Sequence, residues 1–466
     1  MKKSRLFQLF SVLNNEQLRH LKKFVRSPYY NHREDVVLLL DYLLESKRPG
    51  RAAPDRERAF NFLYGDKKFN DGRIRLVMTF LLKIMERFLV QFENKDEVKS
   101  GIALAGIYRK LNLDKHFEHQ LKQLNNTQKK MPHRNIAYYE RYYEIEWERY
   151  GYAVQYRRGG EQLNIAGHNL DIVYFVKKLE QASYGLVHTA VYKTKHSPAL
   201  LSEILEHIEQ EGLCSIPIVS IYYHCYLSLS QPPESGWFHR FRRELDRHKQ
   251  LFPAEELGSL YLLALNFCIR QYNAGNNAYL QEEFELYREG LEGGYLYKDG
   301  YLSRFTYRNI MTVCIAVNQL SWAADFIHRY RSKLEPQYRE AAFSFNLARL
   351  AYQQKDYKAA LILLQKSEFE EIFINISAKI LMVKIFYETE EWDVLQAHLD
   401  SMKVFLYRKR NIGLHKENYL NFIRLAQKLP EINYMSIEDK IKLQTQIQQE
   451  KRLAERAWLL IVTGVN

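Results

Sequence analysis

Histidine and cysteine are the side chains here that could bind a metal or act as nucleophiles, and their spacing limits both roles. His116 and His119 can share one face of a helix, as metal ligands do, but no third ligand accompanies them and a packing or surface role competes. His224 and Cys225 are adjacent and therefore point to different faces of a helix. We predict no metal site.

The sequence lacks a glycine-rich phosphate loop, a dinucleotide-binding glycine pattern, a G-x-S-x-G elbow and an H-E-x-x-H motif. Carboxylates are dense in residues 203–211 and 282–292, at helical spacing and with few basic neighbours, which is typical of a solvated acidic face. A general acid–base pair would need two carboxyl groups close together in a sheltered cleft. We predict no catalytic activity and no cofactor.

Aromatic and basic residues occur together in three places. Residues 138–156 contain eight aromatic side chains and are followed by Arg157 and Arg158, a combination that can stack on unpaired bases. Four glutamates in the same segment would repel phosphates, which favours packing between helices. Residues 239–249 and 407–410 are also basic, and solvated helix surfaces are the favoured explanation of both.

The net charge of +13 is unevenly distributed. The first 200 residues contain 36 Lys and Arg against 22 Asp and Glu, whereas residues 201–300 contain 8 against 15. A positive field of this kind can attract nucleic acid, an acidic protein or an anionic lipid surface. A moderate positive excess on solvated faces is the competing interpretation. Nucleic-acid binding through the basic N-terminal half is therefore our second hypothesis for function.

The chain has few helix-breaking residues, with 11 prolines and 20 glycines in 466 residues. Apolar residues recur at three- and four-residue spacing, and period-two alternation is nowhere sustained, so we predict an all-α fold. Four widely spaced cysteines are typical of free thiols in a reducing compartment. The N-terminus lacks a cleavage site and no apolar run is long enough to span a membrane, so we expect a cytoplasmic protein.

Three segments in the last third of the chain resemble one another in sequence at a spacing of 35 residues. Trp322, Tyr357 and Trp392 are the markers, and each follows a short polar turn between two helical patterns. When the three segments are aligned at this spacing, apolar residues of their first helices fall at matching positions. The turn of the first segment is expected to be offset by one residue. Such helix pairs cannot bury their apolar faces alone and must stack on their neighbours.

Three regions follow from these patterns. Residues 1–95 form a helical N-terminal domain, and residues 96–430 form a solenoid of helix pairs whose clearest repeats occupy 307–407. Residues 431–466 form a C-terminal cap. Its helix is expected to run as one piece over 437–461, beginning after Ser436 with Asp439 at capping-box spacing and burying Trp458.

Residues 342–367 resemble a tetratricopeptide repeat. Leu347, Tyr357 and Ala360 occupy signature positions of that motif, whereas Ala348 replaces its usual Gly and Ile372 its closing Pro. The chain also resembles a family of helical-repeat proteins from Bacteroidota, known as hypothetical proteins, and this resemblance implies a bacterial origin but no activity. The segments that carry it are SPYYN (27–31), NLDIVYFVKKLEQA (169–182), WAADFI (322–327) and NYLNFIRL (418–425).

The tetratricopeptide resemblance implies a protein or peptide partner bound along a concave face made by first helices. Chaperone-binding members carry Lys and Asn, which clamp a terminal carboxylate, where this chain has Phe345 and Arg349, so that activity is not implied. Our first hypothesis is a non-catalytic protein-binding scaffold. Carried over onto the two best copies, the partner-binding residues are Arg349, Tyr352, Gln353, Lys384, Tyr387 and Glu388.

Overall fold

The computed structural model describes residues 1, 3–48, 50, 53–93, 96–156, 161–192, 198–366, 372–409, 415–434 and 436–464. Over these residues the fold is all-α, as predicted, with 23 α-helices. The strands found in them are two-residue segments, β1 (Tyr297–Lys298) and β2 (Tyr301–Leu302), which pair antiparallel as a small hairpin.

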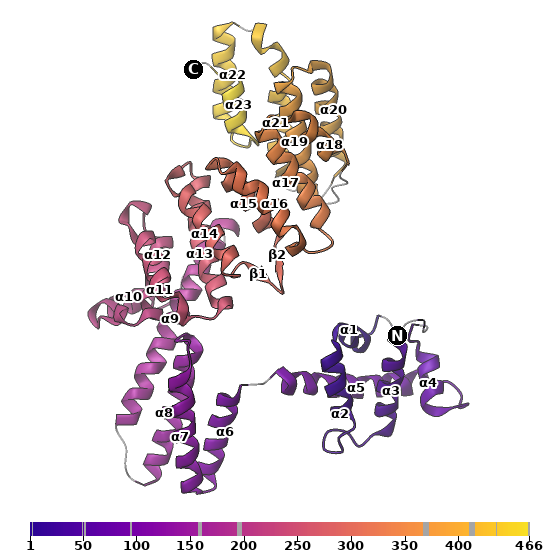
Figure 1. Cartoon of the computed structure of the whole chain (residues 1–466), viewed down its shortest axis with the longest axis vertical. Helices are drawn as coiled ribbons and strands as arrows, with labels where there is room; N and C mark the ends of the chain where they lie inside the picture. The colour runs from indigo at the N-terminus through magenta and orange to yellow at the C-terminus, as the bar shows by residue number, and fades with distance from the viewer. Residues whose placement is uncertain are drawn as a thin grey trace. The chain divides into compact units, whose positions relative to one another are not determined.

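The chain divides into two compact units, Met1–Lys130 with Arg141–Ala166, and Met131–Glu140 with Gly167–Asn466. Figure 1 labels the helices along the chain. The helices that begin in the first unit are α1 (Arg5–Val12), α2 (Asn15–Val25), α3 (Glu34–Ser46), α4 (Arg56–Tyr64), α5 (Asp71–Glu93), α6 (Glu97–Lys110), α7 (Asp114–Lys130) and α9 (Glu161–Tyr192). Two helices contribute residues to both units: α8 (Ile136–Gln155) and α9.

The second unit continues with a long series of helices. They are α10 (Leu201–Gln210), α11 (Pro217–Ser230), α12 (Trp237–His248), α13 (Ala254–Asn273), α14 (Leu280–Glu292), α15 (Arg304–Ala316), α16 (Leu320–Tyr330), α17 (Arg339–Gln353), α18 (Tyr357–Lys366), α19 (Ile372–Glu388), α20 (Trp392–Arg408), α21 (His415–Ala426), α22 (Ile437–Gln449) and α23 (Arg456–Val462). Short 3-10 turns lie at Leu213–Ser215, Pro233–Ser235, Lys249–Leu251, Asn277–Tyr279, Arg331–Lys333 and Leu429–Tyr434.

Helix α5 is the centre of the N-terminal helices. Its apolar stripe, predicted from three- and four-residue spacing, is buried from Ile74 to Phe88, and α1, α2, α3 and α4 all pack against it. Local signals set the helix starts. The Asn14 side chain accepts a hydrogen bond from the Gln17 amide at 2.9 Å, and the Gln17 side chain accepts one from the Asn14 amide at 3.0 Å, which completes a capping box before α2.

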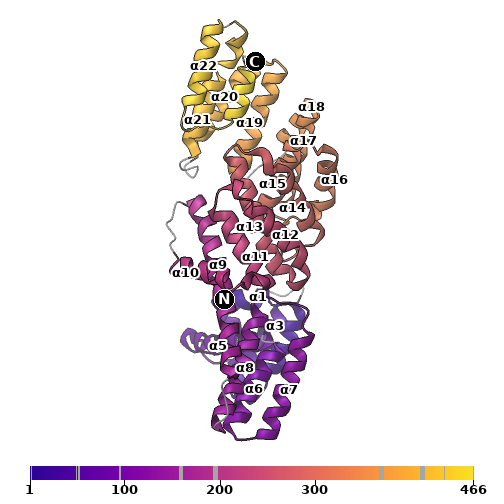
Figure 2. The same cartoon turned by 90° about the vertical axis from the view of Figure 1, so that its left-hand side faces the viewer.

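Consecutive helices of the second unit pack as pairs. Helix α11 contacts α12, α13 contacts α14, α15 contacts α16, α17 contacts α18 and α19 contacts α20. The second helix of a pair also contacts the first helix of the next pair, as α14 does with α15, α16 with α17 and α18 with α19. First helices are neighbours as well, because α15 contacts α17 and α17 contacts α19. Figure 2 shows this series from a second direction.

The turns within the last three of these pairs share one conformation. Asn318, Lys355 and Glu390 have φ values of 56°, 63° and 57°, the left-handed region that ends helices. In each turn the next amide donates to a carbonyl five residues earlier, at 2.8 Å (Gln319 to Cys314), 2.9 Å (Asp356 to Ala351) and 2.9 Å (Glu391 to Phe386). Lys355 and Glu390 lie 35 residues apart, but Asn318 and Lys355 lie 37 apart. The offset of the first copy is therefore two residues, and the predicted one-residue offset is wrong.

The C-terminal segment differs from its prediction. The expected single helix over 437–461 is wrong, because the chain forms α22, turns at residues 450–455 and then forms α23. Arg456 holds the turn, since its guanidinium donates to the carbonyls of Ile447 and Gln448, both at 2.6 Å, at the end of α22. The predicted start is confirmed, because the Ser436 hydroxyl accepts from the Asp439 amide at 3.1 Å.

The same reversal changes which apolar residues of the segment are buried. Ile447 and Trp458 are buried, as expected, and belong to a core shared with α19, α20 and α21. Ile437, Ile441 and Ile461, which were expected to belong to the apolar face of the cap, are exposed. Helices α22 and α23 each bury one side, so the segment does not have the single continuous apolar face that was predicted.

Candidate functional site

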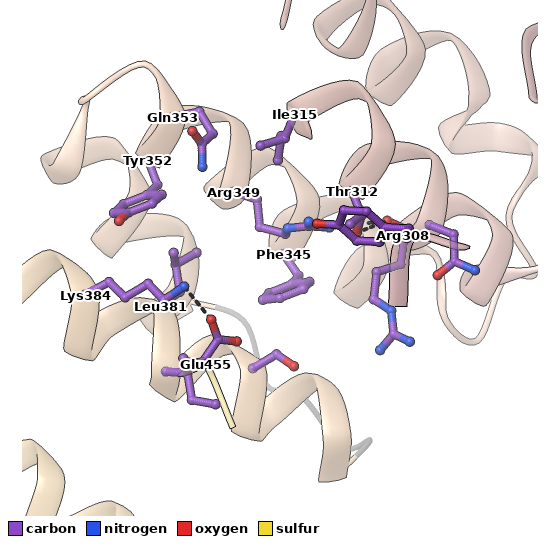
Figure 3. A pocket seen from close by; sticks show the side chains of 14 residues that line it. Arg308, Thr312, Ile315, Phe345, Arg349, Tyr352, Gln353, Leu381, Lys384 and Glu455 are labelled. Atoms are coloured by element: carbon purple, nitrogen blue, oxygen red, sulfur yellow. Dashed lines mark hydrogen bonds and ion pairs between the residues drawn. The ribbon is translucent and has the colours of Figure 1, made fainter. Parts of the chain in front are cut away.

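A cavity of about 490 Å³ lies along the first helices of the second unit. Its wall is made by α13, α15, α17 and α19, together with Glu455 from the turn before α23. Figure 3 shows the side chains around it. The lining residues are Tyr272, Arg308, Asn309, Thr312, Ile315, Phe345, Arg349, Tyr352, Gln353, Ser377, Ile380, Leu381, Lys384 and Glu455.

Arg349 projects from α17 toward α15 (Figure 3). Its guanidinium donates to the Thr312 hydroxyl at 3.0 Å, to the Arg308 carbonyl at 3.3 Å and to the Asn346 side-chain oxygen at 3.3 Å. All three acceptors are neutral. The position of the guanidinium is therefore fixed by hydrogen bonds, while its charge is not compensated by them.

The electrostatics of this wall follow from two arginines. Burial, together with the nearby positive charge of Arg308, lowers the pKa of Arg349 to about 10. Among the residues that the structure describes, no carboxylate forms an ion pair with Arg308 or Arg349, although the more distant Glu455 carboxylate partly offsets the lowering of the Arg349 pKa. Arg349 stays protonated at neutral pH, so this side of the cavity carries positive charge.

The opposite side of the cavity is electrically balanced. The Lys384 ammonium lies 2.6 Å from the Glu455 carboxylate, as Figure 3 shows. Lys384 also lies over the ring of Trp458, 5.6 Å from its centroid. Apolar side chains of Phe345, Ile380 and Leu381 also line the cavity.

Four of the six residues predicted to bind a partner line this cavity: Arg349, Tyr352, Gln353 and Lys384. Gln353 is exposed at the end of α17, and Tyr352 is partly buried. The other two predicted residues do not line the cavity. The structure thus brings together the first-helix positions of two consecutive pairs, together with groups that the sequence did not indicate.

Tyr387 and Glu388 make contacts within the fold. The Tyr387 hydroxyl donates to the Val462 carbonyl at 3.3 Å, and its ring meets the Trp458 ring edge to face at 5.6 Å. Glu388 accepts hydrogen bonds from the hydroxyls of Tyr352 and Tyr357, the latter at 2.5 Å. The bond to Glu388 raises the pKa of Tyr357 to about 12, because the neighbouring carboxylate disfavours a phenolate.

Sequence reasoning missed the contribution of α15. At a step of 35 residues the position matching Arg349 is Cys314, which is buried, whereas at the observed step of 37 it is Thr312, which lines the cavity. The same correction matches Phe345 with Arg308. A turn aligned on Asn318 rather than on Trp322 would have supplied this signal.

The candidate metal and nucleophile residues lie elsewhere. His116 packs against the ring of Tyr108, and the His224 ring nitrogen Nδ1 lies 2.8 Å from the Ser220 carbonyl. Burial raises the pKa of the Cys225 thiol to about 12. In the described ranges no three His, Cys, Asp or Glu side chains are grouped so that they could hold a metal ion.

The acidic segment 282–292 is not the solvated face that its spacing indicated. Arg242, which is buried, is bound by Glu282 at 2.9 Å and by Glu289 at 3.0 Å. Glu283 is only 2% exposed, and burial raises the pKa of its carboxyl to about 7. Tyr261 donates to Glu289 at 2.9 Å. These carboxylates hold α12, α13 and α14 together.

The aromatic residues of α8 pack mostly on one another and on neighbouring helices. Tyr152 stacks on Phe117 at 4.4 Å between ring centroids, and the Tyr156 hydroxyl donates to Asp114 at 2.7 Å. Trp147 keeps 48% of its surface exposed. Arg157 and Arg158, which ended the predicted base-stacking segment, lie outside the described residues.

Comparison with known proteins adds no family: no family model, no curated protein and no solved structure matches the chain. None of the helices that the structure describes is both long enough and apolar enough to cross a bilayer.

Proposed function

We propose that this chain is a non-catalytic, cytoplasmic scaffold whose helix pairs stack as a tetratricopeptide-like solenoid and bind a protein partner along the first helices. One observation carries the proposal. First helices of successive pairs jointly line one cavity and present aromatic, amide and charged side chains there. Arginine and tyrosine are enriched where binding energy concentrates in protein interfaces.

The chemistry of the wall also favours binding over catalysis. Lys384, Glu455 and Tyr352 of this wall are held by structural contacts, since Lys384 pairs with Glu455 and the Tyr352 hydroxyl donates to Glu388. Three buried thiols with raised pKa values, those of Cys225, Cys268 and Cys314, are poor nucleophiles. Free thiols are typical of proteins in a reducing compartment.

Site-specific photo-crosslinking in the organism that makes this protein tests the proposal. A benzophenone amino acid at Gln353, which is exposed on the cavity wall, should yield a discrete crosslinked protein. The control position is Val404 on α20, which is 48% exposed and does not line the cavity. Products that are absent at position 353, or that are the same at both positions, would contradict a partner on the first helices.

A further inference from the structure

The wall formed by α15 and α17 carries two cations without a matching anion in the described chain. Arg349 donates only to the neutral acceptors on Thr312, Arg308 and Asn346, and Arg308 forms no ion pair there. On the other side, Lys384 is already neutralised by Glu455. The excess positive charge is thus localised between two neighbouring first helices rather than spread around the cavity.

Removing a guanidinium from water without a carboxylate partner is unfavourable. The depressed pKa of Arg349 reports this cost, because burial and the like charge of Arg308 both disfavour the protonated form. An anion placed between the two side chains would favour the protonated form of Arg349, as the Glu455 carboxylate already does in part. Arginine is suited to this role because it has five donors, and the three bonds of Arg349 use two donors on Nη1 and one on Nη2.

The rest of the cavity indicates the kind of molecule that would carry the anion. Phe345, Ile380 and Leu381 provide an apolar surface beside the arginines, and a volume of about 490 Å³ is in the range of sites that enclose a small molecule or a few side chains. A ligand with a carboxylate next to an apolar group fits both surfaces.

We propose that this cavity binds an acidic segment of the protein partner, with an Asp or Glu side-chain carboxylate held between Arg308 and Arg349 and a neighbouring apolar side chain against Phe345 and Leu381. The inference rests on the proposed scaffold function and names the chemistry of its partner. The carboxylate in this proposal belongs to an Asp or Glu side chain of the partner and not to its C-terminus.

The test uses a fluorescein-labelled peptide of alternating Glu and Leu residues with an amidated C-terminus, titrated with the full chain in a fluorescence-anisotropy assay. A matched peptide carries Gln in place of every Glu. The cavity variants are Arg349→Met and Arg308→Gln. The control is Arg408→Gln, which removes the same charge from an exposed position on α20 that does not line the cavity.

We expect the acidic peptide to bind, the Gln peptide to bind at least tenfold more weakly, and each cavity variant to weaken the acidic peptide by roughly tenfold or more, with Arg408→Gln unchanged. Thermal unfolding of every variant shows whether it is folded. If Arg349→Met does not fold, the binding measured with Arg308→Gln decides whether the arginines hold the acidic peptide. Absence of binding, equal binding of both peptides, or an equal loss in Arg408→Gln would overturn the proposal.

Further arms separate the alternatives. Stronger competition by inorganic phosphate than by glutarate would overturn the carboxylate assignment in favour of a phosphorylated ligand, and competition by duplex DNA that is abolished in Arg349→Met would assign the cavity to nucleic acid. A crosslink at Gln353 that persists in Arg349→Met would leave the scaffold standing and overturn the acidic recognition. Tight binding of glutarate without any crosslink would assign the cavity to a small acid and overturn the scaffold.

Discussion

The Lys384 ammonium lies 2.6 Å from the Glu455 carboxylate, although 71 residues separate the two in sequence. This ion pair ties the turn before α23 to the first helix α19 at the edge of the cavity. It has two consequences. It fixes one border of the cavity. It also neutralises Lys384, so that of the three cations lining the cavity only Arg308 and Arg349 are left to bind an acidic ligand.

Glu455→Gln should therefore tighten binding of the acidic peptide. The substitution leaves Lys384 charged without its carboxylate partner, and the net positive charge of the cavity rises by one. Because exposed pairs contribute about 0.2–1 kcal/mol, we expect the Kd to fall by roughly 1.4- to 5-fold. Glu450→Gln is the control, since Glu450 pairs with Arg424 and does not line the cavity. An unchanged Kd for Glu455→Gln would show that Lys384 does not take part.

Trp458→Ala should destabilise the C-terminal helices. The ring is 9% exposed and contacts Tyr387 and Phe422, so its removal should cost roughly 3–5 kcal/mol. Hydrogen exchange should increase most in α19 and α21, which share this core. Ile461→Ala in the same helix, where the side chain is 76% exposed, should change stability by less than about 0.5 kcal/mol. Equal effects of the two substitutions would argue against a buried Trp458.

Stability should depend on pH through Glu283. Burial raises the pKa of its carboxyl from 4.5 to about 7, so between these values the folded chain holds a proton that the unfolded chain has released. The free energy of unfolding therefore falls as pH rises through this window. Glu283→Gln should be more stable than wild type at pH 8, by up to roughly 3 kcal/mol, and similar at pH 4.5. Thermal unfolding at the two pH values measures this, and a parallel shift at both would refute the titration of Glu283.

One thiol should react much faster than the others. Cys214 is partly exposed, whereas Cys225, Cys268 and Cys314 are buried. Burial also raises the pKa of Cys225 and Cys314 to about 12, which removes the reactive thiolate at neutral pH. Ellman's reagent should label one cysteine quickly in the native chain and four in denaturant. In Cys214→Ser the fast phase should disappear, and a fast phase that survives would contradict the described burial.

Nucleic acid should bind weakly and only at low salt. Many arginines of the first unit are paired within the fold, for example Arg33 with Asp35, Arg109 with Glu148 and Arg141 with Asp96. Binding that relies on the remaining charge must release counterions and weaken steeply with salt. In filter-binding or anisotropy titrations we expect it to vanish near physiological ionic strength. Tight binding that survives about 200 mM salt would favour the nucleic-acid hypothesis over the scaffold.

Helix content and most helix positions followed from local signals in the sequence. The apolar stripe of α5 and the Ser436 cap of α22 depend on residues three or four apart, and both were predicted. The break between α22 and α23 was not. Residues 450–455 contain good helix formers, and the turn is held by Arg456 reaching back to carbonyls that the sequence pattern does not reveal.

The cavity was predicted only in part, for a geometrical reason. Tyr352 and Lys384 lie in copies whose turns are 35 residues apart, so one alignment placed both on the same face. Asn318 and Lys355 are separated by two residues more than the 35-residue spacing, so an alignment at that spacing is shifted by two residues in α15. Arg308 and Thr312 were therefore not aligned with the cavity-lining residues of α17. Glu455 enters through a contact between segments far apart in the sequence, which periodicity cannot indicate.

The left-handed turns and the long-range closure by Glu455 also bear on biosynthesis. Each helix pair closes with its own turn and packs on the next pair, so these pairs can form in order as the chain is made. The Lys384 ammonium and the Tyr387 hydroxyl, by contrast, acquire their partners Glu455 and Val462 only once residues 455–462 have been synthesised. Until then this border of the cavity lacks the ion pair of Lys384 and the hydrogen bond of the Tyr387 hydroxyl, so the cavity is completed only when the last helix has been made.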